Sequence, residues 1–189
     1  MFNVQCLSYL CIRMLTKTQA IVLHSLKYGE TRLIVDMFTR SYGRLSFIVN
    51  IPKSSKAKVK KQLFQPLTLL EIEVDVRQKV QLQKLSDVRL AAPFLSIPFN
   101  PHKLSISLFV AKFLYYALRS EQRNELLYDY MESSILWLDG QDGHYANFHL
   151  VFLMRLSRFL GFYPNLDDYE AGDYFDLRES VFLPSPPVH

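Results

Sequence analysis

The sequence predicts an α+β protein in which a small β-barrel is followed by an α-helical domain. Three observations predict this class. Apolar and polar residues alternate in short runs through the first half, apolar helical patterns fill the second half, and a proline-rich stretch separates the two. The 189-residue length suits one large or two small domains, and the 49% of apolar residues suffices for a packed core.

Five short runs in the first half have the composition and alternation of β-strands. They are residues 18–27, 31–39, 44–50, 67–76 and 80–88, of which the last is the weakest. In the second run, for example, the alternation places Leu33, Val35 and Met37 on one face. Five strands with a polar, partly helical insert at residues 52–61 fit a five-stranded OB-fold barrel, which binds oligonucleotides on strands 2 and 3 and neighbouring loops. An SH3-like barrel fits the pattern nearly as well.

Residues 91–101 contain three prolines and are expected to link the two domains. The barrel domain is expected at residues 14–92 and the helical domain at residues 93–189. Residues 1–13 are interpreted as a disordered extension or as the result of a start codon assigned too early, with Met14 as the natural start.

Three helices are expected in the second half. They span about residues 100–119, 120–138 and 145–160. Asn100 is expected to cap the first helix, with Pro101 at its first position, and Ser120 to cap the second. Gly161 is expected to end the third.

The cysteines and the hydropathy pattern exclude several protein classes. Cys6 and Cys11 both lie in the N-terminal extension without a nearby histidine or cysteine partner, so we expect neither a zinc site nor a disulfide framework. Residues 1–13 also lack the basic start and cleavage site of a secretory signal. No apolar run is long enough to cross a membrane. The expected location is the cytoplasm, because the sparse cysteines indicate a reducing compartment.

Positive charge is concentrated in the first half of the chain. Residues 1–92 contain 15 Lys and Arg against 6 Asp and Glu, whereas residues 93–189 contain 7 against 12, and the net charge is +4. The asymmetry predicts a basic module that meets a polyanion and an acidic module that does not.

The main basic cluster lies between Lys27 and Lys61, is densest at residues 53–61, and predicts nucleic-acid binding. Phosphate backbones bind such clusters because each neutralised phosphate releases counterions, and interleaved aromatic rings can stack on bases. The predicted DNA-binding residues are Arg32, Arg40, Tyr42, Arg44, Lys53, Lys56, Lys58, Lys60 and Lys61. Tyr42, in a turn, is the best stacking candidate, whereas Phe38 and Phe47 are expected in the core.

No catalytic, metal-binding or cofactor-binding residues are predicted. Glu71, Glu73 and Asp75 form a carboxylate stripe on one strand face, which could belong to a metal-dependent nuclease but is more typical of a solvated face. The five histidines lack metal-ligand spacing, and neither a glycine-rich phosphate loop nor a nucleophile elbow is present. The sequence therefore indicates a non-enzymatic protein without cofactor.

Lys112, Arg119 and Arg123 lie among aromatic residues of the expected helices. A basic rim around an apolar groove would accept an acidic peptide with an apolar end, although ordinary exposed charges explain them equally well. A protein-interaction adaptor with incidental DNA binding is therefore the alternative to a nucleic-acid-binding protein.

The order of four short motifs resembles the RecO family of DNA-repair proteins. The motifs are Tyr28-Gly29-Glu30, the turn Thr39–Arg44 with its T-x-x-x-G-R pattern, Leu63–Glu71 with L-x-Q-P-h-x-x-L-E, where h is hydrophobic, and Arg155–Pro164 with R-L-x-x-x-L-G-F-x-P. The resemblance covers the chain from Met14 to about Leu183.

This resemblance implies an OB-fold followed by a helical domain. It also implies a recombination mediator that binds single-stranded and double-stranded DNA, anneals strands, works with RecR, binds the acidic tail of single-stranded DNA-binding protein and helps to load RecA. Many members carry a cysteine zinc site after the G-F-x-P motif, but residues 165–189 contain no cysteine. The helical domain is also expected to lack the family's final helices.

Overall fold

The computed structural model describes residues 15–52, 59–77, 79–166, 169–176 and 178–187. The chain forms two compact units, Met1–Tyr145 and Ala146–His189. This division follows packing, whereas the expected boundary between residues 92 and 93 follows fold type and stays a prediction.

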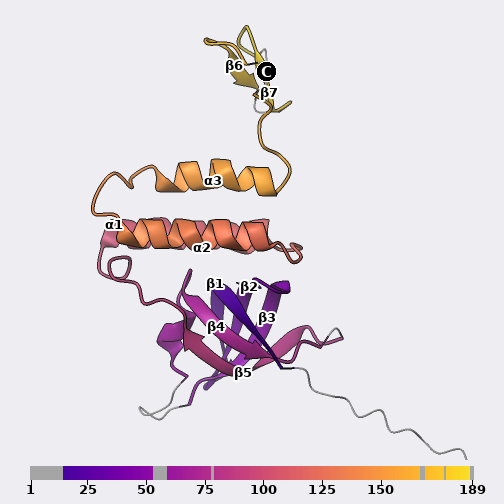
Figure 1. Ribbon diagram of the computed structural model, residues 1–189, viewed down its shortest axis with the longest axis vertical. Helices are drawn as coiled ribbons and strands as arrows, with labels where there is room; N and C mark the ends of the chain where they lie inside the picture. Colours follow the sequence, from indigo (N-terminus) through magenta and orange to yellow (C-terminus); the bar gives the residue numbers. More distant parts are fainter. Residues whose placement is uncertain (1–14, 53–58, 78, 167–168, 177, 188–189) are drawn as a thin grey trace, which may run out of the picture. The chain divides into compact units, whose positions relative to one another are not determined.

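The first unit begins with a closed five-stranded barrel, which confirms the predicted OB-type fold (Figure 1). Its strands are β1 (Thr16–Tyr28), β2 (Arg32–Thr39), β3 (Gly43–Asn50), β4 (Leu69–Val74) and β5 (Leu82–Leu90). The order around the barrel is β1-β2-β3-β5-β4, and β1 closes it by pairing with β4. The pairing of β3 with β5 is parallel, whereas the other pairs are antiparallel.

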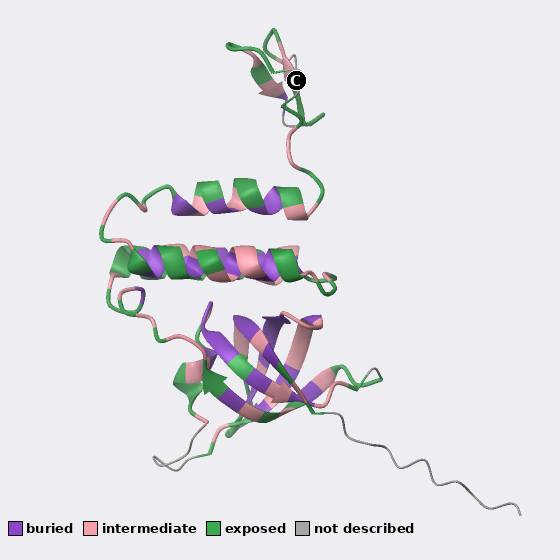
Figure 2. Cartoon of the chain, in the orientation of Figure 1, coloured by how far each residue is buried: buried purple, intermediate pink, exposed green. Residues whose placement is uncertain are grey.

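The alternation in the strands fills the barrel as predicted. Leu33, Val35 and Met37 of β2 are buried in one core cluster with Phe47 of β3 and Ile72 of β4. Figure 2 shows buried and less buried positions succeeding one another along the strands. Between β3 and β4 the insert contains a short 3-10 helix, η1 (Lys61–Phe64), whose Phe64 packs into the same core.

Two helices complete the first unit: α1 (Pro101–Ala117) and α2 (Glu125–Gly140). Asn100 caps α1 as expected, since its side chain accepts hydrogen bonds from the N–H groups of His102 and Lys103. The prediction that Ser120 caps α2 is wrong. The cap is Asn124, whose side chain accepts from the Leu127 N–H, because residues 118–123 form an intervening turn that contacts the barrel.

A hydrogen-bond network around Asp139 and Lys103 connects the linker before α1 to the end of α2. The carboxylate of Asp139 accepts hydrogen bonds from three successive backbone N–H groups, those of residues 95–97, at 2.7–2.9 Å. The ammonium of Lys103, which is only 2% exposed, donates to the Ser96 hydroxyl and to the Asp139 and Gln141 carbonyls. The burial of a lysine is tolerated here because its three donors have acceptors.

The second unit contains α3 (Phe148–Phe159) and a two-stranded hairpin, β6 (Tyr174–Asp176) and β7 (Val181–Leu183). The hairpin was not expected from the sequence, and aromatic contacts hold it, with Phe182 at 4.9 Å from Tyr169 and 5.0 Å from Phe175 between ring centres. In the part of the chain that the structure describes, no helix combines the length and the apolar character needed to cross a membrane.

Candidate nucleic-acid interface

The strand register defines an outer face on β1, β2 and β3, opposite the barrel core. Side chains at directly paired positions point to the same side of a sheet. Three cross-strand rows therefore share this outer strand face: His24–Asp36–Ser46, Leu26–Ile34–Ile48–Lys84 and Tyr28–Arg32–Asn50.

One end of the outer strand face lies beneath α1. Ile21 and Phe38, which are paired and lie outside the barrel core cluster, are both 0% exposed. Next to them the guanidinium of Arg44 donates to the Tyr115 carbonyl of α1 and lies 4.6 Å from the centre of its ring. The ring of His24 is tilted by 41° to the ring of the same tyrosine, with 4.7 Å between the ring centres.

The other end is open to solvent. Leu26 is 55% exposed and Tyr28 is 52% exposed, and Arg32, Asn50 and Lys84 are exposed beside them. We call these five residues the open half of the outer strand face. Three of the five, Arg32, Asn50 and Lys84, line a pocket together with further residues of β3 and β5.

The predicted basic loop ends beside this pocket. Val59 lines the pocket, and the next two residues, Lys60 and Lys61, are exposed at the start of η1. Lys53, Lys56 and Lys58 lie outside the described residues. Of the predicted DNA-binding residues, the structure thus brings Arg32, Lys60 and Lys61 to the open half or its edge.

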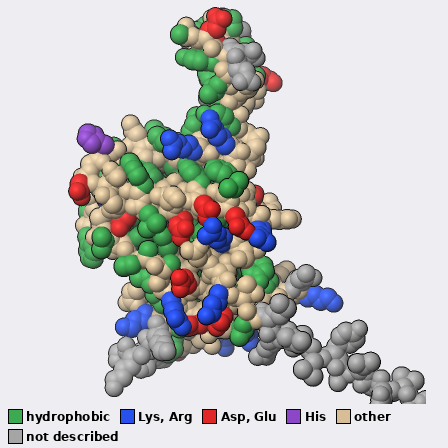
Figure 3. All heavy atoms as spheres, in the orientation of Figure 1, with side chains coloured by type: hydrophobic (Ala, Val, Ile, Leu, Met, Phe, Trp, Pro, Cys, Tyr) green, Lys and Arg blue, Asp and Glu red, His purple; other side chains and the backbone are tan. Residues whose placement is uncertain are grey.

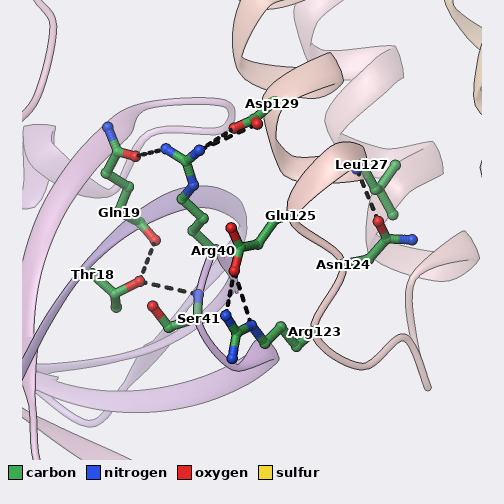
Figure 4. Close-up of polar contacts among 9 residues, drawn as sticks. All are labelled: Thr18, Gln19, Arg40, Ser41, Arg123, Asn124, Glu125, Leu127 and Asp129. Carbon is green, nitrogen blue, oxygen red and sulfur yellow. Dashed lines mark hydrogen bonds and ion pairs between the residues drawn. The ribbon is translucent and has the colours of Figure 1, made fainter.

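Arg40 and Arg44, also predicted to bind DNA, are engaged within the protein. Arg40 donates to the Gln19 side chain at 2.9 Å and pairs with Asp129 of α2 at 2.9 Å (Figure 4). Arg44 lies 3.5 Å from the Asp36 carboxylate, and both side chains are nearly buried. DNA contact by these two arginines stays a prediction, but it would compete with existing ion pairs.

The turn between β2 and β3 packs against the helices, which is why Arg40 and Arg44 form contacts within the protein. The Thr39 hydroxyl accepts from the Tyr42 N–H and donates to the Gly43 carbonyl, and the Arg44 N–H donates to the Glu121 carbonyl in the α1–α2 turn. Gly43 has φ of +70°, and a Cβ there would collide with the backbone of Gln122. This turn is therefore the joint between the barrel and the helices.

The aromatic residue at the joint is buried beside a cation. Arg40 lies 5.9 Å from the ring centre of Tyr128, which is 0% exposed. Burial, together with the neighbouring Glu132 carboxylate, raises the pKa of Tyr128 above its ordinary value, so the phenol stays neutral. At the joint, the ion pair of Arg40 therefore lies next to a buried, neutral aromatic ring.

The predicted stacking residue, Tyr42, is half-buried and packs against the barrel core. Phe47 belongs to that core, and Phe38 is buried on the opposite face of the sheet, so the expectation that both phenylalanines are internal is confirmed. Stacking by Tyr42 stays a prediction.

The carboxylate stripe lies on a charge-balanced surface. Glu71 of β4 pairs across the sheet with Gln19 and Arg89, and Glu73 pairs with Lys17 and Asp87. Figure 3 shows blue and red side chains intermixed over the region of the barrel in view. Asp75 pairs with Arg77 at 3.3 Å. Among the described residues, no three His, Cys, Asp or Glu side chains are grouped so that they could hold a metal ion.

Comparison with known families decides the identity. The family model described as Recombination protein O N terminal matches residues 14–94, and the model described as Recombination protein O C terminal matches residues 98–184. The chain belongs to the RecO family. Members of this family act in DNA repair and recombination.

Curated RecO relatives cover most of the chain. The protein named DNA repair protein RecO from Bacteroides fragilis is 55% identical over 92% of this chain and 72% of its own length. Its counterparts in Phocaeicola vulgatus and Flavobacterium psychrophilum are 49% and 39% identical, over 93% and 89% of this chain and 73% and 70% of their own lengths.

The helical candidates of this RecO family member lie on its surface. Lys112 is exposed on α1, with its ammonium 4.9 Å from the centre of the Tyr116 ring, and Arg119 is exposed in the following turn. Arg123 hydrogen-bonds Glu125 and thereby lowers the pKa of that carboxyl. The structure brings these side chains to α1 and the adjoining turn, and their role in peptide binding stays a prediction.

Sequence reasoning missed Lys84 as a candidate DNA-binding residue of the barrel. It is isolated in the sequence, and only the parallel pairing of β3 with β5 sets it opposite Ile48 and into the pocket that Arg32 lines. The one local signal is its place in a strand-like run, where an exposed lysine would ordinarily be read as solvation.

Proposed function

We propose that this RecO family member is a non-enzymatic recombination mediator. It binds single-stranded and double-stranded DNA, anneals complementary strands and helps to load a recombinase onto DNA coated by single-stranded DNA-binding protein. The observation that carries the proposal is the open half of the outer strand face, with Arg32 and Lys84 along its pocket and Lys60 and Lys61 at the end of the basic loop. Cations along a groove bind phosphates whatever the base sequence.

The partners follow from the same role. We propose that the protein works with RecR, contacts the acidic C-terminal tail of single-stranded DNA-binding protein, and acts on RecA indirectly at the nucleoid. Family membership and the exposed basic and aromatic residues of α1 support these partners.

A metal-dependent nuclease has less support. Cross-strand pairing places Arg89 beside Glu71, and both Lys17 and Asp87 beside Glu73. The two cations oppose the binding of a divalent metal at these carboxylates. Such a site would need several free carboxylate oxygens around one point.

One assay separates the candidate functions. Two complementary labelled strands are incubated with the purified protein, with and without magnesium, and both annealing and cleavage are followed on gels. A mediator accelerates annealing in either condition and leaves the strands intact. Magnesium-dependent cleavage would instead establish a nuclease, and the absence of both annealing and cleavage would favour an adaptor.

The adaptor role predicts a peptide site on α1. Phe109 is 48% exposed and Tyr116 is 56% exposed near Lys112. Changing Arg119→Glu and Arg123→Glu together should weaken the binding of an acidic peptide with an apolar end by about tenfold, because like charges then face each other. Isothermal titration calorimetry measures the effect.

The control for this prediction reverses charge elsewhere. Arg155 and Arg178 are both exposed in the second unit, and changing both to Glu lowers the net charge equally. Peptide affinity should survive this control. If the Arg119 and Arg123 variant binds as tightly as the control, the peptide site lies elsewhere.

A further inference from the structure

An exposed aromatic ring ends the outer strand face on the side away from α1. Tyr28 is the last residue of β1, is 52% exposed and pairs directly with Arg32 of β2. Gly29, with φ of +69°, turns the chain immediately afterwards, so the β1–β2 hairpin carries the ring into solvent. Leu26, one row further in, is 55% exposed and extends the apolar surface.

The charges around this ring favour a polyanion. Arg32 and Lys84 line the adjoining pocket. Two carboxylates lie nearby: Glu30, which has an interaction of its own, and Asp87, which also lines the pocket and pairs with Arg89 at 3.0 Å. The five residues that define the open half thus include two cations, Arg32 and Lys84, and no carboxylate.

A flat ring next to cations suits unpaired bases in particular. Every base has a π-face, so a tyrosine can stack on any of them, while neighbouring cations hold the backbone phosphates. Bases in a duplex already stack on one another and are not accessible in this way. Tyr42 is a poorer candidate, because it is half-buried against the barrel core.

We propose that Tyr28 stacks on an unpaired base of single-stranded DNA while Arg32 and Lys84 contact the adjacent phosphates. The inference rests on the proposed DNA binding and adds a residue that distinguishes single strands from duplexes. The cations of the open half bind single-stranded and duplex DNA alike, whereas Tyr28 contributes only to the binding of single-stranded DNA.

The test compares Tyr28→Ala and Tyr28→Phe with the wild-type chain by fluorescence anisotropy. The probes are a labelled oligothymidine, an abasic strand of equal length and phosphate number, and a duplex. Tyr28→Ala should bind oligothymidine about tenfold more weakly than the wild type, because the stacking contact is lost, and should bind the abasic strand and the duplex as tightly as the wild type. Tyr28→Phe keeps the ring and should bind all three probes like the wild type. Tyr174→Ala, which removes an equally exposed tyrosine (49%) from β6, is the matched control and should change nothing.

Each other outcome overturns the proposal in a recognisable way. Unchanged affinity of Tyr28→Ala for oligothymidine rules out the stacking role but leaves the proposed DNA binding intact. Equal losses on all three probes show that the ring supports the fold of the hairpin. A wild-type chain that binds none of the probes overturns the proposed function as well.

Discussion

Replacing Lys56, Lys58, Lys60 and Lys61 together by alanine is expected to weaken binding to single-stranded DNA at least about tenfold at moderate salt, because several phosphate contacts vanish at once. Lys60 and Lys61 are exposed at the edge of the pocket that Arg32 and Lys84 line, and Lys56 and Lys58 precede them in the chain. Strand annealing should fall in parallel, since it needs two strands held on basic surface. Fluorescence anisotropy and an annealing assay measure the two effects.

The matched control for the lysine variant removes charge of the opposite sign. Changing Glu71 and Glu73 to Gln and Asp75 to Asn should leave DNA binding unchanged or strengthen it. Circular dichroism should show both variants folded, because none of the described positions among them is buried, and substitutions outside a core usually alter stability by no more than about 0.5 kcal/mol each. If the carboxylate variant loses annealing activity while the lysine variant keeps it, the proposed binding of DNA by the basic loop is wrong and an enzymatic function must be considered again.

Asp139→Ala is expected to lower the free energy of unfolding by about 3 kcal/mol, because it leaves one buried and two part-buried N–H donors without their acceptor. The Asp139 carboxylate is the acceptor for the three N–H groups of residues 95–97, and Lys103 adds hydrogen bonds to the same network. Urea denaturation followed by circular dichroism measures the loss. Asp142→Ala, in the exposed loop after α2, is the control and should have little effect.

The same carboxylate makes this stabilisation depend on pH. Burial acts to raise the pKa of Asp139, but the hydrogen bonds from residues 95–97 outweigh burial and hold the pKa below its ordinary value. A depressed folded pKa means that the stabilisation is complete above the unfolded pKa of about 3.9 and is lost as the pH falls further. The difference between wild type and Asp139→Ala should therefore shrink below about pH 4. A difference that stays constant down to full protonation would contradict this assignment.

The sequence predicted the barrel well because the barrel depends on local alternation. Leu33, Val35 and Met37 face the core as the period of two requires, and a polar insert separates β3 from β4. The helix caps were less predictable. Ser120 and Asn124 are both good capping residues, and only the contact of the α1–α2 turn with the barrel selects Asn124.

The candidate site was predicted only in part, because its composition depends on contacts between distant residues. Arg40 and Arg44 belong to a basic stretch, yet Asp129 and Tyr115, which lie 89 and 71 residues further along, hold them at the joint. Lys84 reaches Arg32 through the parallel pairing of β3 with β5, which no local pattern indicates. Charge density pointed to the proposed interface, but it could not tell which cations remain accessible.

The dependence of single-stranded DNA affinity on salt tests the proposed interface most directly. If cations along the open half and the basic loop bind the backbone, a plot of log affinity against log salt should be linear, with a slope of about −0.7 for each phosphate neutralised. The wild-type slope should exceed that of the variant lacking Lys56, Lys58, Lys60 and Lys61 by up to four such increments, about −2.8 in all. An affinity that does not change with salt, or a slope that is identical in the two proteins, would contradict binding of the DNA backbone by this surface.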